Sequence, residues 1–372
     1  MIAHMRSEKE KQTVQQHLDS VSYMAGLYGK VIGLKFCASL GGKVHDLMKF
    51  TEEFKTFIEK SFKNPEKCKQ GPDHSTAGGV YITELVKHRE ETMVRLTAQI
   101  IALASLYHHG GLGDILDMEA ESPYIKRLNK YKEDATWRLG YNEAIHNFLS
   151  IYNQKEIELL FEKAVQEVTD INRRLKKYGS DTVGFMNGLL CKFVYSCVID
   201  ADRYDTATYM ANVKMMPTED YIELWKEFSK RINEKVNNFP KDSHINKLRG
   251  KISEACYKNA ELPCGIYRLN CPTGSGKNYA AMRFALNTAK KYKKSRIFYI
   301  APFISILEQN AESVREILRN KNNKEMDELV ERAVLELHSA KEMQEEDRED
   351  RGTRAVKENK DITTLQEEEL MA

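Results

Sequence analysis

The sequence lacks features that mark whole classes of protein. Its 372 residues hold no uninterrupted apolar run near the roughly 18 residues that a membrane span requires. We therefore expect neither a membrane protein nor a membrane partner. The first residues, MIAHMRSEKEKQ, have no apolar segment behind their charges, and this predicts that no secretory signal is present.

Paired cysteines and an excess of one charge are also missing. The seven cysteines form no C-x-x-C pair, and without an export signal this odd count indicates reduced thiols and a cytoplasmic protein. The formal net charge is only +2, from 57 Lys and Arg against 55 Asp and Glu. This balance neither favours nor excludes nucleic acid as a partner, so local clusters would have to bind any polyanion.

Helical spacing runs through residues 14–237. Apolar residues recur at intervals of three and four, as in Leu96, Ile100 and Leu103, without an alternating strand pattern. A proline inside a polar stretch at residues 239–243 breaks the pattern. We therefore predict an all-α domain over residues 1–240.

The rhythm changes after this break. Two β-rich runs, residues 265–270 (GIYRLN) and 296–301 (RIFYIA), are each followed by a helical pattern, at residues 278–290 and 304–319. Strand–helix–strand–helix with short connections predicts the start of a parallel α/β sheet. We assign residues 241–340 to this partial α/β domain.

The end of the sequence differs from both regions. Residues 341–372 are rich in charge and contain few large apolar side chains. Such a segment cannot bury enough surface to offset the entropy lost on ordering. We predict a charged, disordered tail.

Histidine and aspartate recur in an order that suggests a metal centre. Along the chain come His17, His45-Asp46, His74, His108-His109 and then Asp200 and Asp202. Imidazole nitrogen and carboxylate oxygen suit Mn, Fe, Ni, Co or Zn better than Mg, although Mg is not excluded. Two such ions can bind a phosphodiester, activate water and stabilise the leaving oxygen. A lone histidine is most often structural, so the conjunction of these positions carries the prediction.

The order of these residues resembles the HD phosphohydrolase superfamily. The doubled His108-His109 and the downstream sequence resemble its CRISPR-associated branch, the nuclease–helicase effector of type I interference. The resemblance implies an all-α HD domain that cleaves single-stranded DNA with two divalent transition-metal ions. It also implies recruitment by the Cascade surveillance complex with its CRISPR RNA.

The resemblance also assigns ligands. It implies that His17, His45 and Asp46 hold one ion together with a late aspartate. It further implies that Asp46 bridges to a second ion, whose other ligands are His74, His108 and His109.

Two of these assignments stay open. Residues 200 and 202 point to nearly opposite sides of a helix, so only one can face the ions. The superfamily's alanine–aspartate pair matches Ala201-Asp202, which favours Asp202 over Asp200, and Asp205 shares the face of Asp202 as a candidate supporting group. Lys49 matches the lysine of the HD-x-x-K pattern, which implies a catalytic role beside Asp46 through contact with a phosphate. The alternative for Lys49 is a solvated helix lysine.

A phosphate-binding loop lies between the first predicted strand and its helix. In CPTGSGKN the glycines let backbone amides wrap phosphate oxygens, the lysine neutralises charge, and the helix N-terminus adds its dipole. The loop resembles motif I of superfamily 2 helicases, and RIFYIAPFISILEQN resembles motif Ia, which implies ATP and Mg²⁺ as cofactors. The predicted nucleotide-binding residues are Pro272, Thr273, Gly274, Ser275, Gly276, Lys277 and Asn278.

The helicase-like part departs from the family pattern in two ways. Asn278 stands where a Ser or Thr hydroxyl ligates Mg²⁺, and an amide oxygen offers a different reach. No DEAD- or DExH-type motif follows within the 372 residues. We therefore expect this chain to be a nuclease with an incomplete helicase portion and doubtful ATPase activity.

Two alternatives to the nuclease remain. The first is an HD phosphohydrolase that acts on nucleotides, although such an enzyme has no need of the PTGSGK loop. The second is a truncated, non-catalytic relic that binds nucleic acid or Cascade, although a relic would be expected to lose some of the metal ligands.

Overall fold

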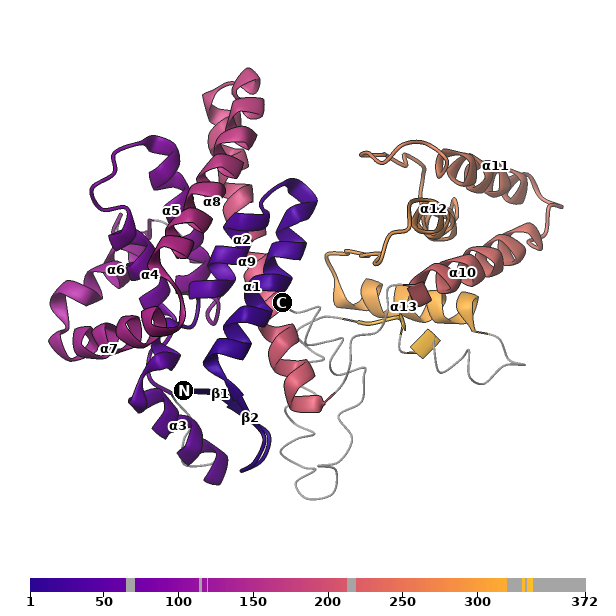
Figure 1. The fold of residues 1–372 in the computed structure, drawn as a ribbon. Coiled ribbons are helices and arrows are strands. Elements are labelled where there is room, and N and C mark those ends of the chain that lie inside the picture. Colours follow the sequence, from indigo (N-terminus) through magenta and orange to yellow (C-terminus); the bar gives the residue numbers. More distant parts are fainter. Residues whose placement is uncertain are drawn as a thin grey trace. The chain divides into compact units, whose positions relative to one another are not determined.

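The computed structural model describes residues 1–64, 71–113, 116–118, 120–212, 219–319, 330–331 and 333–336 (Figure 1). The chain divides between Val213 and Lys214 into two compact units, and each is described by itself. The predicted tail, residues 341–372, lies outside the described residues.

The first unit is predominantly helical, and this confirms the predicted helical character in its described residues. A β-hairpin that the sequence did not predict precedes the helices, because strands of four and three residues are too short to show an alternating pattern. The hairpin consists of antiparallel strands β1 (Ile2–Met5) and β2 (Lys11–Thr13). The α-helices are α1 (Val14–Gly29), α2 (Lys35–Val44), α3 (Glu52–Lys63), α4 (Thr76–Leu85), α5 (Thr92–Tyr107), α6 (Pro123–Glu133), α7 (Ala135–Ile151), α8 (Gln154–Leu175) and α9 (Ser180–Ala211), with 3₁₀ turns η1 (Lys30–Ile32), η2 (Leu47–Phe50) and η4 (Lys176–Tyr178).

The core of this unit lies where α1, α2, α5 and α9 pack together (Figure 1). One cluster of fully buried side chains includes Leu18 of α1, Leu40 of α2, Ile101 of α5 and Val198 of α9. Gly41 permits the close approach of α2 and α9, because a Cβ atom there would lie 2.9 Å from a Val198 methyl group. The helices that bear the predicted ligands are thus held against one another by apolar contacts.

A carboxylate from α8 caps the helix that leads to His45-Asp46. Glu167 accepts hydrogen bonds from the backbone amides of Phe36 (2.9 Å) and Cys37 (3.0 Å), at an N-terminus where Leu34 offers no side-chain cap. Glu167→Ala should therefore destabilise the first unit by about 1 kcal/mol, the usual value of a lost cap. Urea unfolding in a Trp225→Phe background, followed by the fluorescence of the remaining Trp137, measures this loss. Glu167→Gln keeps an acceptor oxygen and should lose less, whereas equal midpoints for Ala and wild type would contradict the capping role.

Among the described helices, α9 is long and apolar enough to cross a bilayer by length and composition alone. The sequence scan for uninterrupted apolar runs missed this stretch because polar residues are scattered through it. Core helices of globular proteins meet the same criterion. α9 packs on α1, α2 and α5 and bears the buried Asp202 and Asp205, and 28% of its apolar window is buried.

The regular elements among the described residues of the second unit are helices. These are α10 (Glu219–Asn237), α11 (His244–Asn259), α12 (Lys277–Tyr292) and α13 (Ile304–Leu318). Phe228 and Ile232 of α10 pack with Leu286 of α12 and Ile317 of α13 in one buried cluster. This apolar contact places α10 in the second unit, so the division falls ahead of the predicted boundary near residue 240.

The two predicted strands are not strands in the structure. Residues 265–270 and 296–301 are described, but neither has a sheet partner there. Ile266 and Ile300 are almost fully exposed. A β-rich composition supplies only a local preference, and a strand forms when a neighbour satisfies its backbone hydrogen bonds. The helices that were predicted to follow these runs are confirmed as α12 and α13.

Candidate metal centre and phosphate loop

Local structure explains how the adjacent His45 and Asp46 can face the same point. α2 ends at Val44, His45 is its C-terminal cap, and the 3₁₀ turn η2 begins at Leu47. The pair therefore lies at a break between two helical segments, where consecutive side chains are not spread around a regular helix. Thr13 caps α1 reciprocally with Gln16 and fixes the helix start one turn ahead of His17.

Four buried side chains form the first group, called site A (His17, His45, Asp46 and Asp202). Asp46 Oδ2 lies 3.3 Å from His17 Nε2 and 3.1 Å from His45 Nε2. Asp202 Oδ1 lies 3.2 Å from His17 Nε2 and 3.5 Å from His45 Nε2. One ligand atom from each residue lies within 4.8 Å of all the others, a spacing that could hold a single ion.

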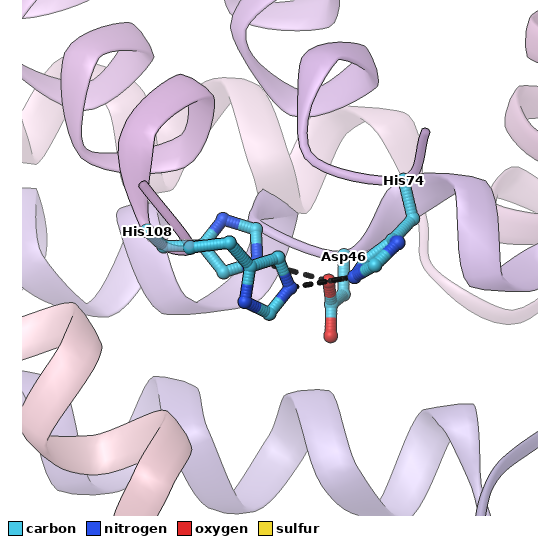
Figure 2. A group of neighbouring side chains, drawn as sticks. Asp46, His74 and His108 are labelled. Atoms are coloured by element: carbon cyan, nitrogen blue, oxygen red, sulfur yellow. Dashed lines mark hydrogen bonds and ion pairs between the residues drawn. The ribbon is translucent and has the colours of Figure 1, made fainter. Parts of the chain in front are cut away.

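The second group, called site B (Asp46, His74, His108 and His109), shares Asp46 with site A. Figure 2 shows His74 and His108 converging on the Asp46 carboxylate, whose Oδ1 lies 3.2 Å from His108 Nε2 and 3.9 Å from His74 Nε2. His74 Nε2 and His109 Nε2 are 2.5 Å apart. Site A is buried throughout, whereas His109 of site B is exposed and His74 is partly exposed. The two oxygens of Asp46 thus serve two neighbouring sites.

The chemistry of these atoms fits a metal centre. His45, His74 and His108 each direct Nδ1 at a backbone carbonyl, of Gly42, Pro72 and Ser105 respectively. Such contacts leave Nε2 as the free ligand atom. The Nε2 atoms of His17, His45 and His108 and both oxygens of Asp46 are buried without a hydrogen-bond partner of normal geometry. Buried polar atoms are rarely left in this state unless a ligand or ion satisfies them.

The charges of the group shift its protonation. Burial alone would lower the pKa of His17, but hydrogen bonds to Asp202 and Asp205 outweigh it and raise that pKa to about 9. Burial alone would lower the pKa of His45 as well, but the negative charges of Asp46 and Asp202 outweigh it and raise that pKa to about 10. The pKa of Asp46 is held well below its usual value because His45 and Lys49 outweigh the effect of its burial. Protons and divalent cations therefore compete for the same nitrogen atoms.

The sequence left open the choice between Asp200 and Asp202 and the role of Lys49. Asp202 belongs to site A, whereas Asp200, two residues earlier on α9, belongs to neither group. Lys49 is buried, and its Nζ lies 2.6 Å from Asp46 Oδ2, so it is not a solvated lysine. It reaches the sites through the carboxylate that both of them share.

Sequence reasoning gave no role to three residues that adjoin the sites. His4 of β1 stacks edge-on against His17 with ring centroids 5.0 Å apart, and burial together with the charges of Lys49 and His17 lowers its pKa to about 3. Gln12 of β2 donates to Asp205. Arg127 of α6 donates to Ser75 Oγ and to the Leu106 carbonyl. It thereby links the segment that bears His74 to the segment that bears His108. Nothing in the sequence pattern signals these contacts, because each joins residues far apart in the chain.

The phosphate loop of the second unit leads directly into α12. Gly274 and Gly276 have φ angles of 76° and 81°, which glycine adopts without strain. Gly276 is the N-cap of α12, and Lys277 is its first residue and is exposed. Arg249 of α11 donates to the Gly274 carbonyl from Nε (2.9 Å) and Nη2 (2.7 Å) and so fixes the loop from one side. The loop therefore presents a helix N-terminus and a lysine to an anion.

Asn278 makes a contact that the sequence could not predict. Its amide nitrogen donates to Asn310 Oδ1 of α13 at 2.6 Å, and Asn310 in turn donates to the Ile306 carbonyl. The side chain that replaces the usual Mg²⁺-binding hydroxyl is thus tied to the helix after the motif Ia-like turn.

Comparison with known proteins bears on the second unit. A family model described as the res subunit of type III restriction enzymes matches residues 226–366. A search of the curated proteins found no match. The matched region begins within α10, includes the phosphate loop and implies ATP-dependent, helicase-type enzymatic function with ATP and Mg²⁺. The predicted helicase segment is confirmed in this general form: residues 226–366 are similar to a helicase-type domain of superfamily 2.

Proposed function

We propose that the first unit is an HD-type nuclease that hydrolyses phosphodiester bonds of single-stranded DNA with two divalent transition-metal ions. The observation that carries the proposal is the pair of adjoining groups, sites A and B, joined by the two oxygens of Asp46. Divalent ions bound there would activate water and neutralise charge on a phosphodiester. Manganese, iron, nickel or cobalt suits this donor set best.

The residues of the chain supply distinct parts of this chemistry. Asp46 holds the two sites together, and His17, His45 and Asp202 complete site A. The exposure of His74 and His109 leaves site B as the side that a substrate phosphate can reach. Lys49 forms an ion pair with Asp46 and would place a positive charge beside the developing negative charge of the phosphate.

The biological setting is proposed from the resemblance and from the second unit. An HD-type centre and a helicase-type segment in one chain match the arrangement of the nuclease–helicase effector of type I CRISPR interference. We therefore propose single-stranded DNA as substrate, the Cascade complex with its CRISPR RNA as partner, and the cytoplasm as location. The match at residues 226–366 supports the helicase-type part of this arrangement.

Removal and return of metal test the proposal. The full chain, stripped with EDTA, should not cleave a labelled single-stranded DNA oligonucleotide, and Mn²⁺, Ni²⁺ or Mg²⁺ should restore cleavage. The His45→Ala/Asp46→Ala double variant should stay inactive with every metal, because it removes ligands from both sites. When the free metal concentration is 100 times the dissociation constant, metal binding should also stabilise the first unit by about 2.7 kcal/mol.

Three outcomes would contradict the proposal. Cleavage that survives EDTA or the double variant would place the activity elsewhere. Hydrolysis of nucleotides without cleavage of DNA would favour a nucleotide phosphohydrolase. Failure to cleave either substrate, with the helical fold intact, would favour a non-catalytic binding protein.

A further inference from the structure

The N-terminal hairpin lies against the metal centre. His4 of β1 and Gln12 of β2 are directly opposite each other in the register of the hairpin, so their side chains share one face. His4 Nε2 lies 3.3 Å from Thr206 Oγ1 of α9, and Gln12 reaches the neighbouring Asp205. The hairpin therefore meets α9 one turn beyond Asp202.

A chain of three polar groups runs from the hairpin to a ligand of site A. Gln12 Nε2 donates to Asp205 Oδ2 at 2.8 Å, and the same oxygen lies 2.7 Å from His17 Nδ1. All three side chains are buried. His17 is thus held through a carboxylate that is itself oriented by the hairpin.

This support differs from that of the other ligands. His45 and His108 are oriented by backbone carbonyls three residues earlier, at their own helix ends, and His74 by the Pro72 carbonyl of the loop that leads into α4. His17 lies inside α1 and relies on a side chain from α9 in its place. A carboxylate at Nδ1 fixes the imidazole tautomer and ring angle and makes Nε2 a stronger ligand.

The side-chain amide of Gln12 is directed at Asp205. Its amide nitrogen must face Asp205, because the alternative orientation would set two oxygen atoms against each other. In this orientation Oε1 is buried without a hydrogen-bond partner, which costs free energy. The donation to Asp205 directs this amide at the carboxylate that holds His17.

We propose that Gln12 and Asp205 are positioning residues that hold His17 for metal binding in site A, so that the N-terminal hairpin is a functional part of the metal centre. The inference rests on the proposed function, since it assumes that site A holds a divalent ion. It assigns a role to residues 1–13, which the sequence pattern left without one.

Metal titration of the full chain tests this inference without recourse to catalysis. Mn²⁺ binding to the EDTA-stripped protein is measured by calorimetry, and Co²⁺ binding by its visible absorption. Asp205→Ala should weaken binding at site A about 10- to 100-fold, the usual effect of losing such a supporting group, and should leave the site B step unchanged. Gln12→Ala should give a smaller loss in the same direction. Asp205→Asn should recover part of the affinity, because its amide oxygen still accepts from His17 Nδ1.

Arg6→Ala supplies the matched control. Arg6 also ties the hairpin to α9, by donating to the Tyr209 carbonyl at 3.2 Å, but it contacts none of the ligands in the described residues. Its variant should bind metal as wild type does. Wild-type affinity in Asp205→Ala and Gln12→Ala would overturn the positioning role, and so would equal losses in Arg6→Ala and Gln12→Ala, which would indicate simple docking of the hairpin. A wild-type chain that binds no divalent ion would overturn the proposed function itself.

Discussion

Replacing Asp46 by asparagine is expected to lower cleavage of single-stranded DNA about 10³-fold and to weaken both metal-binding steps at once. Asp46 Oδ2 faces His17 and His45, and Oδ1 faces His108, so one side chain serves both sites. A bound metal contributes several kcal/mol of transition-state stabilisation, and about 4 kcal/mol corresponds to 10³-fold in rate. The asparagine has nearly the same volume, so the buried site should not collapse.

Single-site variants separate this effect from a general loss of structure. His17→Ala should weaken metal binding at site A alone, and His108→Ala should weaken it at site B alone, because each histidine contacts Asp46 from one side. Asp181→Asn makes the same substitution at an exposed position in the first turn of α9 and should behave as wild type. Cleavage by Asp46→Asn at more than a tenth of the wild-type rate, with metal saturating, would show that the shared carboxylate is not central.

The candidate site could be predicted from the sequence as far as its ligands follow a linear order. His17, His45-Asp46, His74 and His108-His109 were singled out from their order, Asp202 was favoured over Asp200 by the resemblance, and the structure gathers these residues into two groups. Their activity stays a prediction. The supporting contacts of Gln12, His4 and Arg127 could not be predicted, because each joins residues that are far apart in the chain.

The fold shows the same distinction between local and long-range information. Helices α12 and α13 follow from local periodicity and were predicted within a residue or two. The prediction of strands at residues 265–270 and 296–301 was wrong, because a strand depends on a partner that local composition cannot supply. The boundary near residue 240 was placed at a polar, proline-containing break, whereas the apolar face of α10 joins it to α12.

Gly78 is the position where a single added methyl group should do most damage to both the fold and the site. A Cβ atom there would lie 2.0 Å from the Val44 carbonyl oxygen and 2.2 Å from Ser105 Oγ. Val44 directly precedes His45. The Ser105 carbonyl oxygen lies 2.7 Å from His108 Nδ1. α4 would have to move away from α2 and α5, and the two ligands would move with their helix ends.

We therefore expect Gly78→Ala to destabilise the first unit by about 3 kcal/mol, the upper range for overpacking a core, and to weaken metal binding at both sites. A Trp225→Phe background leaves Trp137 as the single tryptophan, so its fluorescence during urea unfolding reports the first unit alone. Gly184→Ala and Gly188→Ala in α9 are the matched controls, because a Cβ atom at either position meets no atom within 4 Å beyond its chain neighbours and the nearby backbone of its own helix. These two should be stabilised by roughly 0.5–1 kcal/mol, as helix-interior glycines are when replaced by alanine. The close contact of α4 with α2 and α5 would be refuted if Gly78→Ala were as stable as these controls, since only that contact distinguishes the three substitutions.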